Sequence, residues 1–152
     1  MLSDRALTRI STGLRGRGLR MAGKLNVPVY RLSRGRVMGK IGHAPVLLLT
    51  TTGRRSGQRR TAPVVYLADR DRLVVIGSNA GNAKAPAWAL NLEANPDAEA
   101  EVGAERRPVR ARIALGEERE DLWRRMNDQY GGFDAYRERT GRDIRLFVLE
   151  PR

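Results

Sequence analysis

Hydrophobic positions repeat at near-helical spacing in the first part of the chain. Leucine, isoleucine and methionine recur through residues 4–24, which predicts a helix with Ser3 or Asp4 as its N-cap. A short second helix is predicted over Asn26–Met38 and is expected to end at Gly39. The amino-terminal part of the chain is therefore expected to be helical rather than extended.

From Pro45 onward the pattern changes to that of β-strands separated by short turns. Strands are predicted over Val46–Thr52, Thr61–Ala68, Arg72–Ser78, Asp97–Val102, Pro108–Leu115 and Ile144–Leu149. Helices are predicted over Ala83–Asn95, with Pro86 in the first turn, over Glu117–Tyr130 and over Phe133–Thr140. Because the connections have hairpin length and no βαβ unit repeats, we expect an α+β fold with an antiparallel sheet or a small barrel.

The chain carries a net charge of +12, and all of the excess lies in its first 60 residues. Residues 1–60 hold 14 Lys and Arg against one acid, whereas residues 61–152 hold 15 basic and 16 acidic residues. This asymmetry indicates a localised anionic partner, which could be nucleic acid, an anionic membrane surface or a multiply charged cofactor. Residues 4–24 combine cations with apolar positions, so this segment is either a lipid-binding helix or a solvated extension.

The rarity of histidine and the absence of cysteine exclude several kinds of site. With no Cys and one His among 152 residues, thiol catalysis, iron–sulfur ligation and a Cys/His zinc site are ruled out. A Ser-His-Asp hydrolase would depend on His43 alone, which we interpret as structural or incidental. The longest strongly apolar stretch, Pro45–Thr50, is far short of the roughly 20 residues of a membrane-spanning helix. A soluble intracellular protein with one globular domain is expected.

The loop Gly53–Arg60 is the most informative part of the sequence. Two glycines allow the backbone to approach a ligand, Ser56 adds a hydroxyl, and four arginines supply planar donors for phosphate or carboxylate. The loop lacks the lysine and spacing of a Walker phosphate loop. Its alternative interpretation is an ordinary basic hairpin turn.

Two further features carry candidate chemistry. The strand end Gly77–Gly81 and the helix containing Trp88 could offer backbone N–H groups and an aromatic wall to a flat ligand. Tyr130, Phe133 and Tyr136 recur at spacings of three, and their phenols could donate to an acceptor oxygen. The alternative for all of these aromatic residues is packing in the core.

Taken together and in this order, these motifs resemble the deazaflavin-dependent nitroreductase and quinone reductase family. The first two motifs are Leu-Thr-Thr-Thr-Gly-Arg-Arg-Ser-Gly-x-x-Arg-x-x-Pro at residues 49–63 and Gly-Ser-Asn-x-Gly at residues 77–81. The others are Pro86-x-Trp88-x-x-Asn91, and Tyr130-x-x-Phe133-x-x-Tyr136 followed by Thr140-x-Arg142-x-Ile144. The resemblance covers about residues 26–150. It implies a split β-barrel (antiparallel, FMN-binding-like) with flanking helices over residues 26–152, preceded by a basic N-terminal helix over residues 1–25.

The same resemblance implies an activity and a cofactor. Such a protein would transfer a hydride from reduced coenzyme F420, an 8-hydroxy-5-deazaflavin with a phosphate and an oligoglutamate tail, to a quinone, nitroaromatic or similar activated acceptor. No metal and no nucleic acid are expected. The protein is expected to be cytoplasmic, with peripheral contact through residues 4–24 at the inner face of the cell membrane.

Residue roles follow from the resemblance in the same way. The residues that would bind the phosphate and the acidic tail of the coenzyme are Arg54, Arg55, Ser56 and Arg60. Further coenzyme contacts fall to Thr61, Ala62, Pro63, Val64, Val65, Ile76, Gly77, Ser78, Asn79, Ala87, Trp88, Ala89, Leu90 and Asn91. The acceptor pocket falls to Tyr130, Phe133 and Tyr136, with catalytic orientation of the acceptor by the hydroxyls of Ser78, Tyr130 and Tyr136.

Three positions depart from the family pattern, and two other functions compete with the enzyme. The family commonly has lysine at Asn79, tyrosine at Phe133 and often an aromatic residue at Val65. One alternative is a nucleic-acid-binding module that uses the basic half of the chain, although the aromatic residues are not interleaved with the cations. The other is a split barrel that binds FMN or haem.

Overall fold

The computed structural model describes residues 27–41, 44–81 and 83–152. The predicted basic helix at residues 1–25, the domain boundary that follows it, and His43 lie outside the described residues. The described part contains seven strands: β1 (Lys40–Ile41), β2 (Ala44–Thr52), β3 (Arg59–Asp69), β4 (Arg72–Ile76), β5 (Asp97–Val102), β6 (Glu105–Ile113) and β7 (Leu146–Pro151). The helical elements are a turn of helix at residues 27–32, η1 (Asn79–Gly81), α2 (Ala87–Ala94), α3 (Gly116–Gln129) and α4 (Phe133–Thr140).

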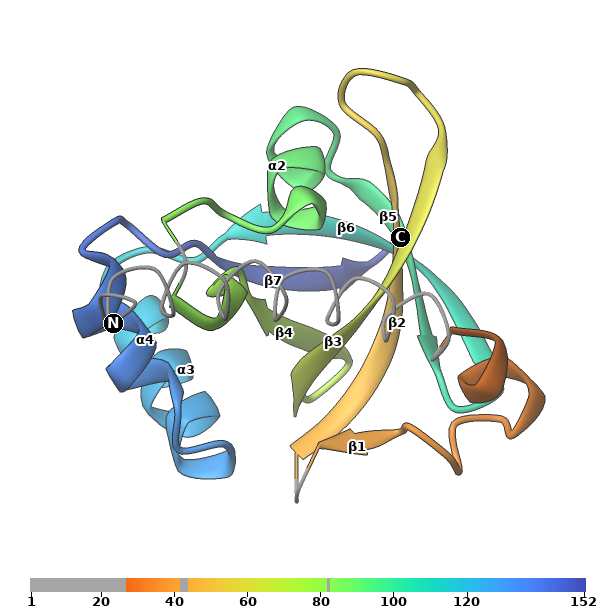
Figure 1. Cartoon of the computed structure of the whole chain (residues 1–152), viewed down its shortest axis with the longest axis horizontal. Helices are drawn as coiled ribbons and strands as arrows, with labels where there is room; N and C mark the ends of the chain where they lie inside the picture. Colours follow the sequence, from red (N-terminus) through yellow and green to blue (C-terminus); the bar gives the residue numbers. More distant parts are fainter. Residues whose placement is uncertain (1–26, 42–43, 82) are drawn as a thin grey trace, which may run out of the picture.

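The strands form one antiparallel sheet that closes on itself. Their order is β1-β2-β3-β4-β7-β6-β5, and an additional pairing of β2 with β5 completes a six-stranded barrel (Figure 1). Every neighbouring pair is antiparallel, as the short connections predicted. Closure leaves no unpaired edge between β2 and β5.

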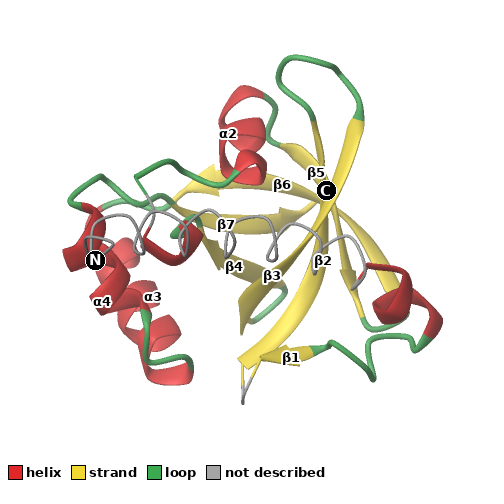
Figure 2. Ribbon diagram, in the orientation of Figure 1, coloured by secondary structure: helices red, strands yellow, loops and turns green. Residues whose placement is uncertain are grey.

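Every second side chain along the strands points into the barrel, and these apolar side chains fill its interior. Leu47 and Leu49 on β2, Val75 on β4 and Phe147 on β7 belong to one buried cluster, together with small residues of β5 and β6. Ala89 and Leu92 of α2 belong to the same cluster, so this helix covers one end of the barrel. In Figure 2, α2 lies at the same end as the loop that joins β2 to β3.

The outer face of β4 and β7 is buried as well, because α3 and α4 pack on it. Val74 and Val148 alternate with the inward residues and contact Leu122 and Met126 of α3 in a second cluster. These two strands are therefore apolar on both faces, which explains their continuous hydrophobic runs.

The helix predicted over Asn26–Met38 is shorter than expected. Within the described part of this predicted helix only residues 27–32 are helical, because Arg34 and Gly35 take positive φ values of 55° and 79° that end the helix. The buried Tyr30 hydroxyl donates to the Val46 carbonyl (3.0 Å) and accepts from the Gly103 N–H (3.0 Å). The short helix is thereby fixed against β2 and the β5–β6 turn.

Other boundaries also shift by a few residues. The helix predicted from Ala83 begins at Ala87, and Pro86 is its extended N-cap rather than part of its first turn. The helix cannot readily start earlier, because Ala85 precedes a proline and such residues disfavour the helical conformation. Strand β6 begins at Glu105 rather than Pro108, since Gly103 (φ 62°) allows a tight turn that pairs Val102 with Glu105. α4 spans the predicted residues Phe133–Thr140.

Candidate functional site

The loop between β2 and β3 is a closed turn with an exposed basic tip. The Gly53 N–H donates to the Gln58 carbonyl (2.7 Å), and the Gln58 N–H donates to Ser56 Oγ (3.2 Å). A Cβ on Gly53 would lie 2.6 Å from Ser56 Oγ, and Gly57 has a φ of 69°, so both glycines are required by the turn. The predicted turn is thus confirmed, and its internal bonds fix the loop backbone.

The four arginines of this loop differ from those of the carboxyl-terminal half. Arg54, Arg55, Arg59 and Arg60 are all exposed, and within the described ranges none of them forms an ion pair. By contrast, arginines such as Arg112 and Arg125 are paired with carboxylates. The loop therefore presents concentrated positive charge that the described chain does not neutralise.

Helix α2 holds this loop through a single buried amide. Asn91, 4% exposed, accepts a hydrogen bond from the Arg54 N–H (3.1 Å) and donates to Thr51 Oγ1 (3.0 Å). The sequence predicts that Asn91 contacts the coenzyme, and in this structure its amide joins α2 to the end of β2 and to the loop. Its role here is to place the basic loop beside α2 (Figure 1).

The strand end after β4 lies directly against the start of α2. The Gly77 N–H donates to the Arg145 carbonyl (2.9 Å), and a Cβ on Gly77 would lie 3.1 Å from Ala89 Cβ. Ser78 is buried at 7% exposure, whereas Asn79 is exposed and donates from its side chain to the Lys84 carbonyl (2.9 Å). The close approach at Gly77 brings the second predicted feature next to the helix that holds the first.

Arg142 crosses from the end of α4 to this segment, a contact that the sequence did not reveal. Its Nη2 donates to the carbonyls of Gly77 (3.1 Å) and Ser78 (2.8 Å). Partial burial lowers the pKa of Arg142 from its ordinary value. No spacing rule could predict this contact, since Arg142 is 64 residues from Ser78 along the chain.

The third feature lies on the other side of the Ser78 segment. A Cβ on Gly81 would lie 3.1 Å from Tyr136 Cα, so η1 and α4 pack closely. The ring of Phe133 is buried between Tyr130 and Tyr136, with edge-to-face centroid distances of 5.4 and 6.1 Å. Phe133 therefore packs against its aromatic neighbours, in agreement with the alternative that these aromatic residues belong to the core.

The two phenols meet at their hydroxyls. Tyr130 Oη and Tyr136 Oη are 3.4 Å apart, and both side chains are half-buried. The hydrogen bond to Tyr130, together with burial, raises the pKa of Tyr136 above its ordinary value. The Tyr136 phenol consequently remains protonated at neutral pH and can act as a donor.

The predicted coenzyme-lining residues on β3 divide between two faces. Ala62 and Val64 belong to or pack on the barrel core, whereas Val65 packs on the outer cluster under α3 and α4. Thr61 Oγ1 lies 2.8 Å from Thr50 Oγ1. Alternation means that the side chains of the run Thr61–Val65 cannot all contact one ligand.

The remaining predicted residues lie on β4 and α2. Ile76 is buried in the outer cluster. Trp88 is half-buried and contacts Phe147 edge to face at 5.9 Å, as the packing alternative proposed, while Leu90 is half-buried and Ala87 is exposed. Trp88 thus joins the cover of the barrel end to its core.

The three features form one continuous belt across the end of the barrel. Contacts run from Arg54 to Asn91, from α2 to Gly77, and from Gly81 to Tyr136. A closed antiparallel barrel with flanking helices is the architecture of a split β-barrel protein, and the exposed arginines of the β2–β3 loop form its candidate site for an anionic ligand.

The chain belongs to the F420H(2)-dependent quinone reductase family, whose family model matches residues 22–151. An F420H(2)-dependent quinone reductase of Mycobacterium tuberculosis is 35% identical over 133 residues, which cover 85% of this chain and 89% of that protein. A second relative from the same species, also named for this activity, is 43% identical over 108 residues, or 71% of this chain and 91% of its own length.

Solved structures agree with the fold. The structure of an F420-H2 dependent reductase, FDR-A, has a TM-score of 0.65 and 34% identity, and the match covers 70% of this chain and 94% of that one. The haem storage protein HutZ of Vibrio cholerae has a TM-score of 0.53 over 84% of this chain and 88% of its own, at 17% identity. The latter likeness shows the shared barrel alone. The predicted split β-barrel is confirmed.

Proposed function

We propose that this chain is an F420H2-dependent oxidoreductase that reduces a quinone. Family membership supports the reaction, and one observation of the structure carries its assignment to a site. Four arginines without carboxylate partners in the described chain stand on a loop that Asn91 holds against α2, and the same helix packs against Gly77 through Ala89. We propose that the arginine loop binds the anionic groups of the ligand and that the Gly77–Ser78 segment binds its flat ring.

The residues present fit the deazaflavin coenzyme. Its phosphate and oligoglutamate tail match the exposed guanidinium groups of Arg54, Arg55 and Arg60, which can form bidentate bonds to phosphate and carboxylate. The peptide N–H groups of Ser78 and Asn79 have no acceptor among the described residues, so they are available to a ring oxygen or nitrogen. When bound, F420H2 supplies the hydride, and the protein supplies binding and orientation.

Tyr130 and Tyr136 are proposed to orient the acceptor. Their hydroxyls lie 3.4 Å apart, the backbone of Tyr136 packs against Gly81 three residues after Ser78, and the raised pKa of Tyr136 keeps its proton in place. A phenol aimed at an acceptor oxygen stabilises the charge that develops there during reduction. The Ser78 hydroxyl is proposed as a third donor to the acceptor.

A quinone is the acceptor that we favour over a nitroaromatic. The family name supports a quinone, and Phe133 offers no hydroxyl where the family commonly has tyrosine. The buried Phe133 ring leaves two phenols rather than three on this side of the belt. We therefore propose nitroaromatic compounds as slower substrates.

Peripheral membrane contact through residues 4–24 is a separate part of the proposal. In the described ranges no helix has the length and apolar character that crossing a bilayer requires. Deleting residues 1–24 should abolish co-sedimentation with anionic liposomes while turnover of a water-soluble quinone persists. Retained co-sedimentation would reject the lipid role of this segment.

The first test is a fluorescence titration with F420, with FMN and a short DNA duplex as parallel controls at moderate salt. Saturable binding of F420 alone, at micromolar concentration or tighter, is the expected result. Binding of FMN instead would mean that the barrel carries another flavin, and steeply salt-dependent binding of DNA alone would favour a nucleic-acid module. Either of these results would overturn the proposed function.

A further inference from the structure

One arginine fixes the orientation of two successive peptide groups at the proposed site. Arg142 Nη2 lies 3.1 Å from the Gly77 carbonyl oxygen and 2.8 Å from that of Ser78. The Ser78 carbonyl also accepts the Gly81 N–H at 2.9 Å. Both carbonyls therefore point toward the side of the segment on which Arg142 lies.

The orientation of the carbonyls determines that of the neighbouring N–H groups. The described chain has no cis peptide bond, and in a trans peptide the N–H points opposite to the C=O. The N–H groups of Ser78 and Asn79 consequently point away from Arg142. Neither finds an acceptor in the described parts of the chain, and Ser78 is 7% exposed. In the buried residue Ser78, an N–H without an acceptor in the described chain indicates a place for a ligand atom, and the N–H of the exposed Asn79 is open to the same ligand.

We propose that Arg142 is a positioning residue that holds the Ser78 and Asn79 N–H groups as a pair of donors toward the bound coenzyme or acceptor. This inference rests on the proposed function and deepens it. Two adjacent N–H groups that point the same way suit an oxygen that gains charge as the reaction proceeds. Arg142 acts on them through the carbonyls and does not touch the ligand.

The chain around Arg142 explains how its side chain reaches this segment. α4 ends at Gly141, whose φ of 63° turns the backbone out of the helix immediately before Arg142. Two residues later Ile144 is buried in the outer cluster and leads into β7, which pairs with β4. The guanidinium is thus anchored on both sides, and it can bond two carbonyls because its donors lie in one plane.

The test compares Arg142→Met and Arg142→Lys with the control Arg124→Met. Methionine keeps an unbranched side chain without donors, whereas lysine keeps a cation that can still donate. Arg124 is exposed on α3 and pairs with Asp121, so its replacement removes the same charge far from this segment. Three quantities are measured: the Ser78 and Asn79 amide chemical shifts in the free protein, the F420 dissociation constant, and kcat and KM for a quinone.

We expect Arg142→Met to shift these two amide resonances and to weaken F420 binding or kcat by about tenfold, the effect of one lost hydrogen bond. Arg142→Lys should recover part of this loss, and Arg124→Met should change neither quantity. Unchanged amide shifts in Arg142→Met would overturn the proposal, as would amide shifts spread over the whole protein with an equal loss in Arg142→Lys. If wild type itself does not bind F420, the proposed function fails, whereas the amide shifts still test the positioning by Arg142.

Discussion

Arginine side chains in this protein have two different environments. Those on β6, on α3 and immediately before β7 mostly pair with a carboxylate, as Arg110 pairs with Asp97 and Arg145 with Glu93. Those on the β2–β3 loop face none in the described chain, although the loop itself is held by internal hydrogen bonds. A fixed backbone with unneutralised cations is suited to binding an anion, because little order has to be gained on binding.

Replacing Arg55 and Arg60 together by alanine should weaken F420 binding about 100-fold or more. The reason is that a hydrogen bond to a charged group contributes about 1.5–3 kcal/mol. The measurement is a fluorescence titration at constant ionic strength. The double variant Arg110→Ala/Arg124→Ala removes the same charge from exposed ion pairs elsewhere and should bind F420 like wild type. Equal affinity in both double variants would reject the assignment of the loop to the phosphate and tail.

The Tyr136 hydroxyl should affect turnover rather than coenzyme binding. Tyr136→Phe is expected to lower kcat for a quinone about tenfold and to leave the F420 dissociation constant unchanged, because this hydroxyl is proposed to donate to the acceptor and not to the coenzyme. Since the pKa of Tyr136 is raised, its phenol stays protonated and should contribute no break to the pH–rate profile between about pH 6 and 9. The control is Tyr66→Phe, which changes a half-buried tyrosine on β3, and this variant should reduce the quinone at the wild-type rate.

At the scale of elements, the site depends on how a loop, a strand end and two helices are joined. α2 supplies Asn91 to the β2–β3 loop and Ala89 to the close contact with Gly77. α4 supplies Tyr136 to the contact with Gly81, and the turn after it supplies Arg142. The contacts of Asn91 and Arg142 are made by single side chains, so these two can be removed by single substitutions.

Asn91→Ala should release the basic loop from α2. The substitution leaves the Arg54 N–H and Thr51 Oγ1 without their partner in a buried place, at a cost of about 1–3 kcal/mol in the free energy of unfolding. F420 binding should weaken as well, because the loop is no longer held against α2. Asn95→Ala, at the exposed end of the same helix, is the control for both measurements. Normal coenzyme affinity in Asn91→Ala would show that α2 does not position the loop.

Most elements could be predicted from the sequence because their signals are local. The spacing of Leu122, Trp123 and Met126 predicted α3, and these three side chains are the ones that it buries. Errors arose where a backbone conformation or a partner strand decides the boundary, as at Arg34 or at Glu105. A run such as Glu105–Arg107 is too polar to be recognised as a strand until β5 is seen to pair with it.

At the scale of the whole molecule, the site could be predicted only in part. The motif residues Arg54, Gly77 and Tyr136 were identified from their residue types, and the barrel brings their segments into one belt. The closure of β2 on β5 and the contact of Arg142 with Ser78 join residues about 50 or more positions apart, which no periodicity encodes. The structure was needed to show which segments meet.

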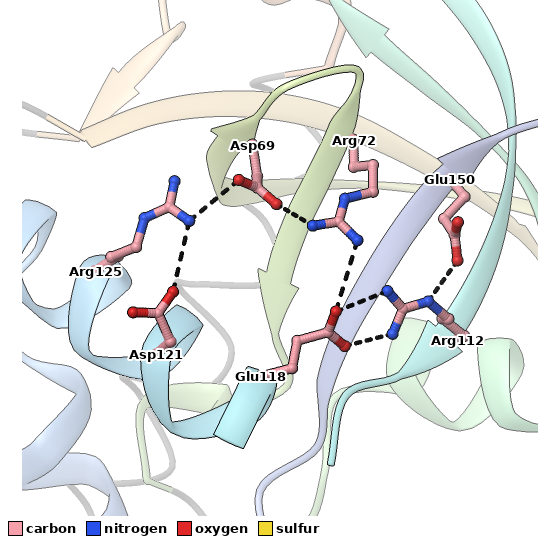
Figure 3. Close-up of polar contacts among 7 residues, drawn as sticks. All are labelled: Asp69, Arg72, Arg112, Glu118, Asp121, Arg125 and Glu150. Atoms are coloured by element: carbon pink, nitrogen blue, oxygen red, sulfur yellow. Dashed lines mark hydrogen bonds and ion pairs between the residues drawn. The ribbon is translucent and has the colours of Figure 1, made fainter. Parts of the chain in front are cut away.

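A network of ion pairs attaches α3 to the barrel and should set the acid stability of the whole protein (Figure 3). Asp69 at the end of β3 accepts from Arg72 and Arg125, and Glu118 of α3 accepts from Arg112 (2.9 Å). These arginines hold the pKa values of both carboxyls below their ordinary range. Glu150 of β7 also pairs with Arg112, so the network joins four strands to one helix, and its loss is expected to loosen the helical layer on the outer face of β4 and β7.

The sign of the pH dependence follows from the lowered pKa values. The unfolded chain takes up protons at the ordinary carboxyl pKa of about 4, before the folded chain does, so the stabilisation is present above about pH 5 and is lost as pH falls through the lowered values. Asp69→Asn should reduce the free energy of unfolding at pH 7 by about 1–2 kcal/mol, because the neutral amide cannot replace a carboxylate between two cations.

Urea unfolding at pH 7 and pH 3.5 measures both effects. Wild type should lose more stability between these two pH values than Asp69→Asn, because the variant has already lost the group that titrates. Glu138→Gln, which changes an exposed side chain on α4, is the control and should follow wild type at both pH values. An equal acid loss in wild type and Asp69→Asn would mean that the attachment of α3 does not depend on this carboxylate, and that the Glu118 pairs and the packing of Leu122 and Met126 hold the helix to the barrel.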